Sequence, residues 1–461
     1  MRPAPIHDAV TAVFVHDREV FVVRRHRAMT AFPGYCAFPG GKLEKSDTNA
    51  RFDGGTLSDH SPRLVRGLAR ELREELGFNF FAAWRDGLIE GLHCLGEVTT
   101  PAFAPVRFRT WFYRVDLAER PDFTPDRREF EAAEWARPGA LVRQYRRGRL
   151  LLVPPTLATL RALVADPAAR TVRKLDPGFR DDEIPMVEPL GGVRLLMVPS
   201  NTLPPAQATN CLHVGDPGSP GLLVDPSPRD EATYGRLKAQ AAELGVDRIL
   251  LTHHHADHRE HANRLARELD VPMLMSSYTW DRLRRLDGGK WFSGVRALRI
   301  KEGDEVTHWQ GESVQVLAVP GHDRGQLALM PESRAWCLVG DLIQGIGTVV
   351  IAPPEGDMAT YFDTMERVIG LRPRVVIPSH GGAMGSVHRL QAALDHRRSR
   401  EQQILEGLAA GQDEQALLAS LYGDIDQRLL PLALINIRGH VQKLEQEGRR
   451  PAPPDNRNAH A

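Results

Sequence analysis

Short apolar runs in the second half of the chain end in loops that carry metal-binding side chains. The runs and the residues after them are 248–251 before His253, His255, Asp257 and His258; 314–319 before His322; 335–339 before Asp341; and 374–377 before His380. Short apolar runs are typical of buried strands, and ligands of open α/β folds bind at the carboxyl ends of strands. The pattern therefore predicts an α/β domain with a metal site at one edge of its sheet.

The donor types at these positions favour transition metals. Imidazole and carboxylate groups suit Zn²⁺, Mn²⁺ or Fe. A histidine-rich surface turn is the alternative for residues 252–258 taken alone, and an ordinary loop or core histidine is the alternative for His322 or His380 alone. The shared position of all these side chains after a strand favours a metal site over both alternatives.

Residues 186–395 resemble the metallo-β-lactamase superfamily. Their metal-binding motifs come in the same order as in that superfamily: His-x-His-x-Asp-His, then Gly-His, then Gly-Asp, then a late His. The resemblance implies an αββα sandwich that holds two metal ions. It assigns His253, His255 and His322 to the first metal, Asp257, His258 and His380 to the second, and Asp341 to a bridge between them. Asp257 would also orient the attacking hydroxide as a catalytic residue, and Asp225 would support a ligand from outside the first shell.

The expected chemistry is direct hydrolysis. Two cations roughly 3.5–4 Å apart lower the pKa of a shared water, so that hydroxide is available near neutral pH. They also polarise the scissile bond and stabilise the negative charge that develops on it. Zn²⁺ is the expected metal, with Mn²⁺ or Fe as alternatives. Cleavage of an ester-like bond then needs no serine or cysteine nucleophile.

The N-terminal part carries a second group of carboxylates. Ser61-Pro62 predicts the start of a helix and Gly77 its end. Three carboxylates share one face of this helix, at spacing i, i+3 and i+4: Glu71, Glu74 and Glu75. Like charges so close repel one another, and Mg²⁺ would relieve the repulsion. A solvated face with neighbouring arginines as partners is the alternative on the helix alone.

Two segments together resemble the Nudix box of nucleoside-diphosphate-X hydrolases. They are Phe38-Pro39-Gly40-Gly41 and, later in the chain, Arg70-Glu71-Leu72-Arg73-Glu74-Glu75-Leu76-Gly77-Phe78. The resemblance covers residues 5–165 and implies an α/β/α fold. It makes Glu71 and Glu74 catalytic residues and assigns Glu71, Glu74 and Glu75 to Mg²⁺ or Mn²⁺. The Gly41 carbonyl and Glu134 are further candidates.

The Nudix-like box departs from the family pattern in two places. Asp47 stands where the family has a glutamate, and residues 48–69 are inserted before Arg70. The helix remains intact, so metal binding can survive while substrate choice changes. An interrupted box of this kind is similar to that of the peroxisomal coenzyme A diphosphatases. We therefore expect hydrolysis of a nucleoside-diphosphate-X or coenzyme A-type pyrophosphate.

A chain of 461 residues exceeds the usual size of one domain. The fold class expected is α/β multidomain. The expected parts are a Nudix-like domain at 1–165, a linker rich in proline and charge at 166–185, a metallo-β-lactamase domain at 186–395, a winged-helix-like module at 396–448 and a disordered tail at 449–461.

Three amphipathic helices are predicted near the C-terminus, at 399–408, 413–422 and 430–447. Ser399 is the expected N-cap of the first. The last mixes basic and acidic side chains, so it lacks the concentrated positive face of a typical DNA reader. Nucleic-acid contact is therefore an alternative for this module and not its leading interpretation.

The C-terminal module, with Val349 and Val350 after Asp341, resembles the β-lactamase-like protein 2 family. That family includes endoribonucleases that prefer single strands, and fungal relatives act as thioesterases. The resemblance therefore leaves thioester and phosphodiester cleavage open. An acyl-thioester, coenzyme A or nucleotide derivative is the expected substrate, and single-stranded RNA is the alternative. A ligand-sensing regulator with Nudix and winged-helix parts is disfavoured by the complete set of metal ligands.

Composition excludes several other classes. Zero net charge argues against wholesale polyanion binding, though a local patch is still compatible with it. The four cysteines form no CxxC pair and no disulfide pattern. No apolar stretch is long enough to cross a membrane, and the N-terminus lacks the apolar core of a signal peptide. We expect a cytoplasmic protein without a membrane partner.

Overall fold

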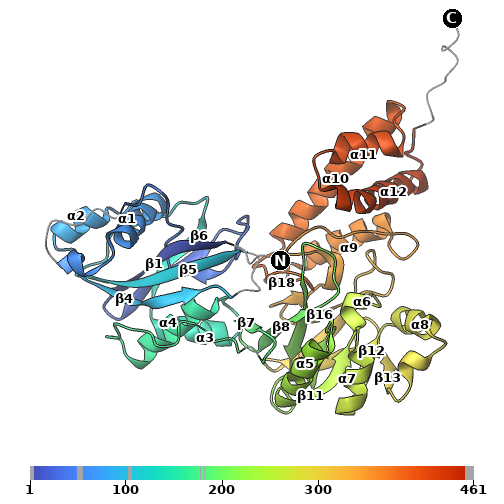
Figure 1. The fold of residues 1–461 in the computed structure, drawn as a ribbon, viewed down its shortest axis with the longest axis horizontal. Coiled ribbons are helices and arrows are strands. Elements are labelled where there is room, and N and C mark those ends of the chain that lie inside the picture. Colours follow the sequence, from blue (N-terminus) through green and yellow to red (C-terminus); the bar gives the residue numbers. More distant parts are fainter. Residues whose placement is uncertain (1–4, 49–55, 102–105, 177, 181, 452–461) are drawn as a thin grey trace, which may run out of the picture. The chain divides into compact units, whose positions relative to one another are not determined.

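The computed structural model describes residues 5–48, 56–101, 106–176, 178–180 and 182–451 (Figure 1). The described residues divide into two compact units, one within 1–181 and 185–194 and the other within 182–184 and 195–461. Part of the predicted insertion, 49–55, lies outside the described residues, as does most of the predicted disordered tail, 452–461. No helix of the described part is both long and apolar enough to span a membrane.

A mixed sheet forms the centre of the first unit. Its described strands lie in the order β3-β2-β1-β5-β4, with β6 paired to β2. β1 is parallel to β5 and antiparallel to β2. The elements are β1 (Ile6–His16), β2 (Glu19–Arg25), β3 (Cys36–Ala37), η1 (Thr56–Asp59), α1 (Pro62–Leu76), α2 (Phe80–Arg85), β4 (Ile89–Thr99), β5 (Arg107–Leu117), β6 (Phe130–Ala136), α3 (Pro138–Arg146), α4 (Pro154–Ala165) and β7 (Met186–Leu190).

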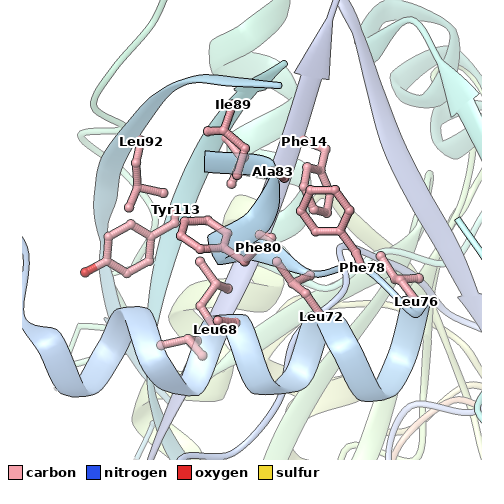
Figure 2. Packing of buried hydrophobic residues seen from close by; sticks show 14 of the residues in the cluster. Phe14, Leu68, Leu72, Leu76, Phe78, Phe80, Ala83, Ile89, Leu92 and Tyr113 are labelled. Carbon is pink, nitrogen blue, oxygen red and sulfur yellow. The ribbon is translucent and has the colours of Figure 1, made fainter. Parts of the chain in front are cut away.

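Side chains of β1 alternate between two hydrophobic cores, because successive residues of a strand point to opposite faces of the sheet. Val10 and Phe14 pack with the leucines of α1 and with α2, as Figure 2 shows for Phe14. Val13 and Val15 pack with α3 and α4. Helices therefore cover both faces of the sheet, which confirms the predicted α/β/α fold.

α1 begins and ends as the sequence predicts. Pro62 occupies its first turn, where a missing N–H costs nothing, and Gly77 ends it with a left-handed φ of 65°. Ser61 is the N-cap by backbone conformation, but its side chain accepts no capping hydrogen bond. The buried leucines of this helix fix its orientation on the sheet, and so determine which way its glutamates face.

The predicted linker is partly attached to the first unit. Residues 166–176 contain no helix or strand, yet Val172 and Leu175 are buried in the core under α3 and α4. The Val172 N–H donates a hydrogen bond of 2.7 Å to the Leu95 carbonyl. This part of the segment is therefore packed, although its composition is that of a linker.

The second unit contains two sheets. In the first sheet the order is β13-β12-β11-β10-β9-β8, and in the second it is β14-β15-β16-β17-β18. The elements are β8 (Val193–Pro199), β9 (Ala208–Val214), β10 (Gly221–Val224), α5 (Glu231–Glu243), β11 (Val246–Leu250), α6 (Ala256–Arg259), α7 (Ala262–Leu269), β12 (Met273–Met275), α8 (Ser277–Leu286), η2 (Lys290–Phe292), β13 (Ala297–Arg299), β14 (Glu305–Trp309), β15 (Glu312–Ala318), β16 (Leu327–Pro331), β17 (Cys337–Leu338), η3 (Gly340–Leu342), α9 (Met358–Leu371), β18 (Val376–Ile377), α10 (His388–Ala409), α11 (Glu414–Tyr422), η4 (Gln427–Leu429) and α12 (Leu430–Gln446).

Helices cover the outer face of each sheet. Leucines of α5, α7 and α8 share a core with the first sheet, and side chains of α9 and α10 share a core with the second. The loops at the ends of the strands are joined by backbone hydrogen bonds, such as Leu327 N–H to the Thr252 carbonyl at 2.9 Å. The unit is therefore the predicted αββα sandwich, and the predicted ligand loops meet at one edge of it.

The C-terminal helices differ from prediction at their start. α10 begins at His388 and continues to Ala409, so Ser399 lies inside a helix and the prediction that it caps one is wrong. α11 and α12 fall close to their predicted positions, and a small core of Ile404, Leu417 and Ile437 joins the three helices. The helical module is confirmed, and residues 447–451 contain no strand that could form a wing.

Glu401 links α10 to α12 and predicts a pH-dependent stability. It is buried, accepts a 3.0 Å hydrogen bond from Lys443 and lies 3.4 Å from His440 Nδ1. Burial would raise its pKa, but bonds from His440 and Lys443 lower the pKa from 4.5 to about 2. A lowered pKa in the folded state stabilises the protein above pH 4.5, and this contribution is lost as the pH falls toward 2.

We therefore expect Glu401→Gln to lower the melting temperature at neutral pH and to differ less from wild type at about pH 3. Thermal unfolding at both pH values measures this. Glu406→Gln, an exposed position on the same helix, is the matched control. A decrease in the melting temperature of Glu401→Gln that is equal at both pH values would contradict the prediction.

Candidate metal centre

The loop after β11 is anchored by Asp225. The carboxylate of Asp225 accepts hydrogen bonds from the Thr252 backbone N–H at 2.8 Å and from the Thr252 hydroxyl at 2.7 Å. Both residues are buried. Asp225 has a φ of 53°, a left-handed conformation that aspartate tolerates better than most residues. This anchor fixes the start of the loop that carries four of the predicted ligands.

Three imidazoles meet in a first cluster. His255 Nδ1 lies 2.9 Å from His253 Nε2 and 3.1 Å from His322 Nε2. The outer nitrogens of two rings have partners: His253 Nδ1 lies 3.0 Å from the Thr252 hydroxyl, and His322 Nδ1 lies 2.9 Å from the Val350 carbonyl. Such outer contacts fix the orientation of a ring and leave its inner nitrogen free to bind a cation.

Asp257, His258 and His380 form a second cluster. His380 Nε2 lies 3.4 Å from an oxygen of Asp257, and His258 Nε2 lies 3.8 Å from the other. The outer nitrogen of His258 contacts Asp225 at 2.8 Å, and that of His380 contacts the Ala208 carbonyl at 2.9 Å. Asp225 therefore contacts the predicted ligand His258 from behind.

Asp341 lies between the two clusters. Its carboxylate is 3.8 Å from His322 Nε2 in the first cluster. It is 3.6 Å from His258 Nε2 and 3.4 Å from His380 Nε2 in the second. The structure therefore brings together every ligand predicted from the strand ends: His253, His255, Asp257, His258, His322, Asp341 and His380.

The two clusters fit divalent cations. Buried atoms that have no hydrogen-bond partner include His258 Nε2, His380 Nε2 and Asp341 Oδ1. The two nitrogens lie 3.6 and 3.4 Å from the Asp341 carboxylate. Leaving such a group unsatisfied costs about 1–3 kcal/mol. Nitrogen and carboxylate donors of this kind suit Zn²⁺, Mn²⁺ or Fe. His255 and Asp257 keep 31% and 19% of their side chains exposed, so solvent reaches this side of the clusters.

The electrostatics favour metal binding. Burial and neighbouring imidazoles lower the pKa of His253 well below its ordinary value and that of His255 to about 4, so both rings are neutral at pH 7. His380 differs, because the attraction of Asp341 and Asp257 outweighs burial and raises its pKa to about 10. A proton on that ring would compete with a cation, and metal binding would release it.

A further set of polar side chains beside the first cluster was not predicted. His254 Nδ1 lies 2.7 Å from Asp323, and His254 Nε2 lies 3.2 Å from Glu355. The same carboxylate of Glu355 lies 3.5 Å from His255 Nε2, and Arg282 pairs with Glu355. Glu355 is therefore the outer partner of the His255 ring. Asp323 follows the predicted ligand His322 directly, which was the one sequence signal for this set.

In the first unit, the predicted glutamates lie on α1 beside the loop at 38–41. Glu75 accepts a 2.7 Å hydrogen bond from the Gly40 N–H. A Cβ atom on Gly41 would lie 2.3 Å from a carboxylate oxygen of Glu71, so a larger residue at this position would displace the Glu71 carboxylate. The Gly41 carbonyl accepts a bond of 2.9 Å from the Val10 N–H, which uses one of its lone pairs.

Arg70 organises these carboxylates. It bonds Glu71 at 2.9 Å and Glu74 at 3.1 Å, and it pairs with the buried Asp47 at 3.1 Å. Asp47 therefore contacts the helix across the insertion. Within the described residues, the groups of three or more donors that converge lie in the second unit, so Glu71, Glu74 and Glu75 do not converge as the second-unit ligands do.

Glu129 joins this acidic group although the sequence pointed to Glu134. The charge of Glu129 raises the pKa of both Glu71 and Glu75. Burial is the larger cause, and it raises the pKa of Glu75 to about 8 against the opposing effect of the Gly40 N–H. Close negative charges and burial together make this face of α1 a candidate for Mg²⁺ or Mn²⁺.

Comparison with known proteins divides the chain in the same way. Residues 205–380 match the family model described as metallo-beta-lactamase superfamily, and residues 5–152 match the model described as NUDIX domain. A beta-lactamase-like protein 2 homolog of Drosophila melanogaster is 28% identical over 254 residues, which are 53% of this chain and 84% of the relative.

Two other matches concern the second unit. A hydroxyacylglutathione hydrolase of Bdellovibrio bacteriovorus is 28% identical over 162 residues, which are 35% of this chain and 55% of the relative. The crystal structure of a beta-lactamase domain protein from Burkholderia ambifaria aligns with a TM-score of 0.49 and 22% identity, over 59% of this chain and 91% of that one.

Proposed function

We propose that the chain is a metal-dependent hydrolase with two separate centres, because residues 205–380 match the metallo-beta-lactamase superfamily model and residues 5–152 match the NUDIX domain model. Both are families of hydrolases. The observation that carries the proposal is the meeting of two histidine clusters around one buried carboxylate, Asp341.

In the second unit, each predicted ligand has a place in a dinuclear centre. His253, His255 and His322 would hold the first cation, Asp257, His258 and His380 the second, with Asp341 shared between them. Zn²⁺ is the metal proposed, with Mn²⁺ or Fe as alternatives. Divalent cations bound there would supply a water ionised near neutral pH and would polarise the bond to be cleaved. Asp257, partly exposed in the second cluster, would orient that water.

A thioester is the bond that we propose for this centre. Hydroxyacylglutathione, which the matched hydrolases act on by name, is an acyl thioester. An acyl-coenzyme A fits the same chemistry and would be a natural companion to a Nudix centre that acts on a coenzyme A-type pyrophosphate. Single-stranded RNA, whose phosphodiester the same centre could hydrolyse, is the alternative substrate.

The test is a substrate screen on Zn²⁺-loaded protein. We expect wild type and Glu74→Ala to release thiol from at least one acyl-coenzyme A or acyl-glutathione, and His253→Ala to release none. Thiol release is measured with a chromogenic thiol reagent. The opposite outcome is that wild type releases no thiol but degrades unstructured RNA, and that His253→Ala does not. The proposed substrate bond would then be a phosphodiester and not a thioester.

In the first unit we propose hydrolysis of a pyrophosphate bond with Mg²⁺ or Mn²⁺. Glu71, Glu74 and Glu75 would bind the cation, with Glu71 and Glu74 as the residues nearest the chemistry. The pairing of Arg70 with Asp47 supports an active box, because it keeps the helix and the segment before the insertion in contact. Nucleoside-diphosphate-X compounds and coenzyme A are the substrates to compare.

A further inference from the structure

Residues 349–351, named here the strap, contact a candidate metal ligand from behind. The carbonyl of Val350 accepts the hydrogen bond of 2.9 Å from His322 Nδ1. This is the contact that orients the His322 ring in the first cluster. Whatever fixes the strap therefore also fixes the direction in which His322 Nε2 points.

The C-terminal helices hold the strap on both sides of Val350. Arg397 of α10 donates a 2.6 Å hydrogen bond to the Val349 carbonyl. Asn436 of α12 accepts a 3.1 Å bond from the Ile351 N–H. Arg397 and Asn436 are only 7% and 9% exposed, so water does not readily replace these bonds. Because Val349 and Ile351 flank Val350, the two bonds leave its carbonyl little freedom to turn.

α12 packs directly against the strap at Gly439. A Cβ atom on Gly439 would lie 3.4 Å from the Ile351 carbonyl, an ordinary van der Waals distance, and 3.3 Å from the flexible end of the Met358 side chain. The backbone of α12 is therefore in close contact with the strap at this point.

Arg397 also contacts the helix that packs against the Asp341 segment. Its guanidinium carbon lies 4.8 Å from the centre of the Tyr361 ring of α9. The Tyr361 hydroxyl donates a 2.8 Å hydrogen bond to the carbonyl of Leu342, the residue after Asp341. Arg397 therefore bonds the strap behind His322 directly and is linked to the Asp341 segment through Tyr361.

We propose that α10 and α12 position the first metal cluster through the strap, with Arg397 and Asn436 as positioning residues. The C-terminal helices would then set the metal affinity of the cluster of His253, His255 and His322. Because α10 runs from His388 to Ala409 without a break, it joins the hydrolase domain to the helical module as one element. The inference rests on the proposed function, since it requires that these histidines bind metal.

The test measures metal affinity and not activity. Metal-free full-length protein is titrated with Zn²⁺ against a chromophoric chelator to give two dissociation constants, which His322→Ala and His380→Ala assign to the two clusters. We expect Asn436→Leu to raise the first constant roughly threefold to tenfold, less than the 10- to 100-fold cost of losing a direct outer partner. The second constant should stay within about twofold.

Two further variants make the result specific. Asn436→Asp keeps an acceptor oxygen and should restore most of the affinity, and Arg397→Met should act like Asn436→Leu. Arg438→Leu is the control, because Arg438 is exposed on the same helix and pairs with Glu414 of the helical module. With Co²⁺ in place of Zn²⁺, the visible absorption bands should shift in Asn436→Leu and not in Arg438→Leu.

The outcomes separate the two proposals. Folded Asn436→Leu and Arg397→Met proteins with an unchanged first constant would overturn the strap inference, and so would an equal rise of both constants. If Asn436→Leu does not fold, Arg397→Met alone decides. Wild-type protein that binds none of Zn²⁺, Mn²⁺ and Fe²⁺ would overturn the proposed function instead.

Discussion

Asp341→Asn is expected to abolish thioester hydrolysis and to reduce bound Zn²⁺ from two ions per chain to one or none. Asp341 is the carboxylate within 4 Å of ligand nitrogens in both clusters, His322 on one side and His258 and His380 on the other. Asparagine keeps the size of the side chain but removes the negative charge that two cations would share. The loss of activity should exceed the roughly 10- to 100-fold cost of removing an outer-shell partner.

The experiment combines metal analysis with kinetics. Bound Zn²⁺ is measured by elemental analysis after dialysis, and thiol release from the best thioester gives kcat/KM. Asp363→Asn is the matched control, since Asp363 is an exposed aspartate on α9 of the same unit. Full metal content and near-normal activity in Asp341→Asn would show that the two clusters do not form one centre.

The second-unit site could be predicted from the sequence because its ligands follow strands. β10 to β13 run parallel, so their carboxyl ends lie at one edge, and the loop after β11 carries four of the donors. Asp225, which directly follows β10, was predicted from the resemblance to the metallo-β-lactamase superfamily. The end of a strand can be recognised from the nearby sequence alone. Parallel strands end at the same edge of a sheet, so the side chains that follow them lie close together.

The outer contacts could not be predicted because they depend on loops that meet only in the folded chain. Glu355 reaches His254 and His255 from a loop about a hundred residues later. No period or spacing connects those segments. The same holds for the contact of Asn436 with the strap. Glu129 and Glu134 lie close together in sequence, and only the path of the chain before β6 shows that Glu129 affects the helix carboxylates.

The start of α10 was missed for a different reason. Ser399 with Gln402 three residues later has the pattern of a capping box, but the helix begins earlier, at His388. Leu390 and Leu394 pack into the core of the second sheet, and this burial outweighs the local preference of serine for a helix end. Tertiary packing therefore determined the boundary.

Glu75→Gln is expected to remove Mg²⁺-dependent pyrophosphate hydrolysis by the first unit. The rate should fall by at least the roughly 10- to 100-fold that removal of an outer-shell partner of a metal ligand costs. Thioester hydrolysis should not change. In the metal-free protein, burial raises the pKa of Glu75 from 4.5 to about 8. A raised pKa of this kind means that the folded state binds the proton more tightly than the unfolded state, so stability is lost as the pH rises from 4.5 through about 8.

Mg²⁺ reverses that loss because it favours the ionised carboxylate. We therefore expect Mg²⁺ to raise the melting temperature of wild type more at about pH 8.5 than at about pH 6, because fewer protons must leave at the higher pH. In Glu75→Gln the increase should be small at both pH values, whereas Glu90→Gln, an exposed position on β4, should behave as wild type. A Mg²⁺ effect in wild type that does not depend on pH would show that Glu75 is not a ligand, because binding would then release no proton from it.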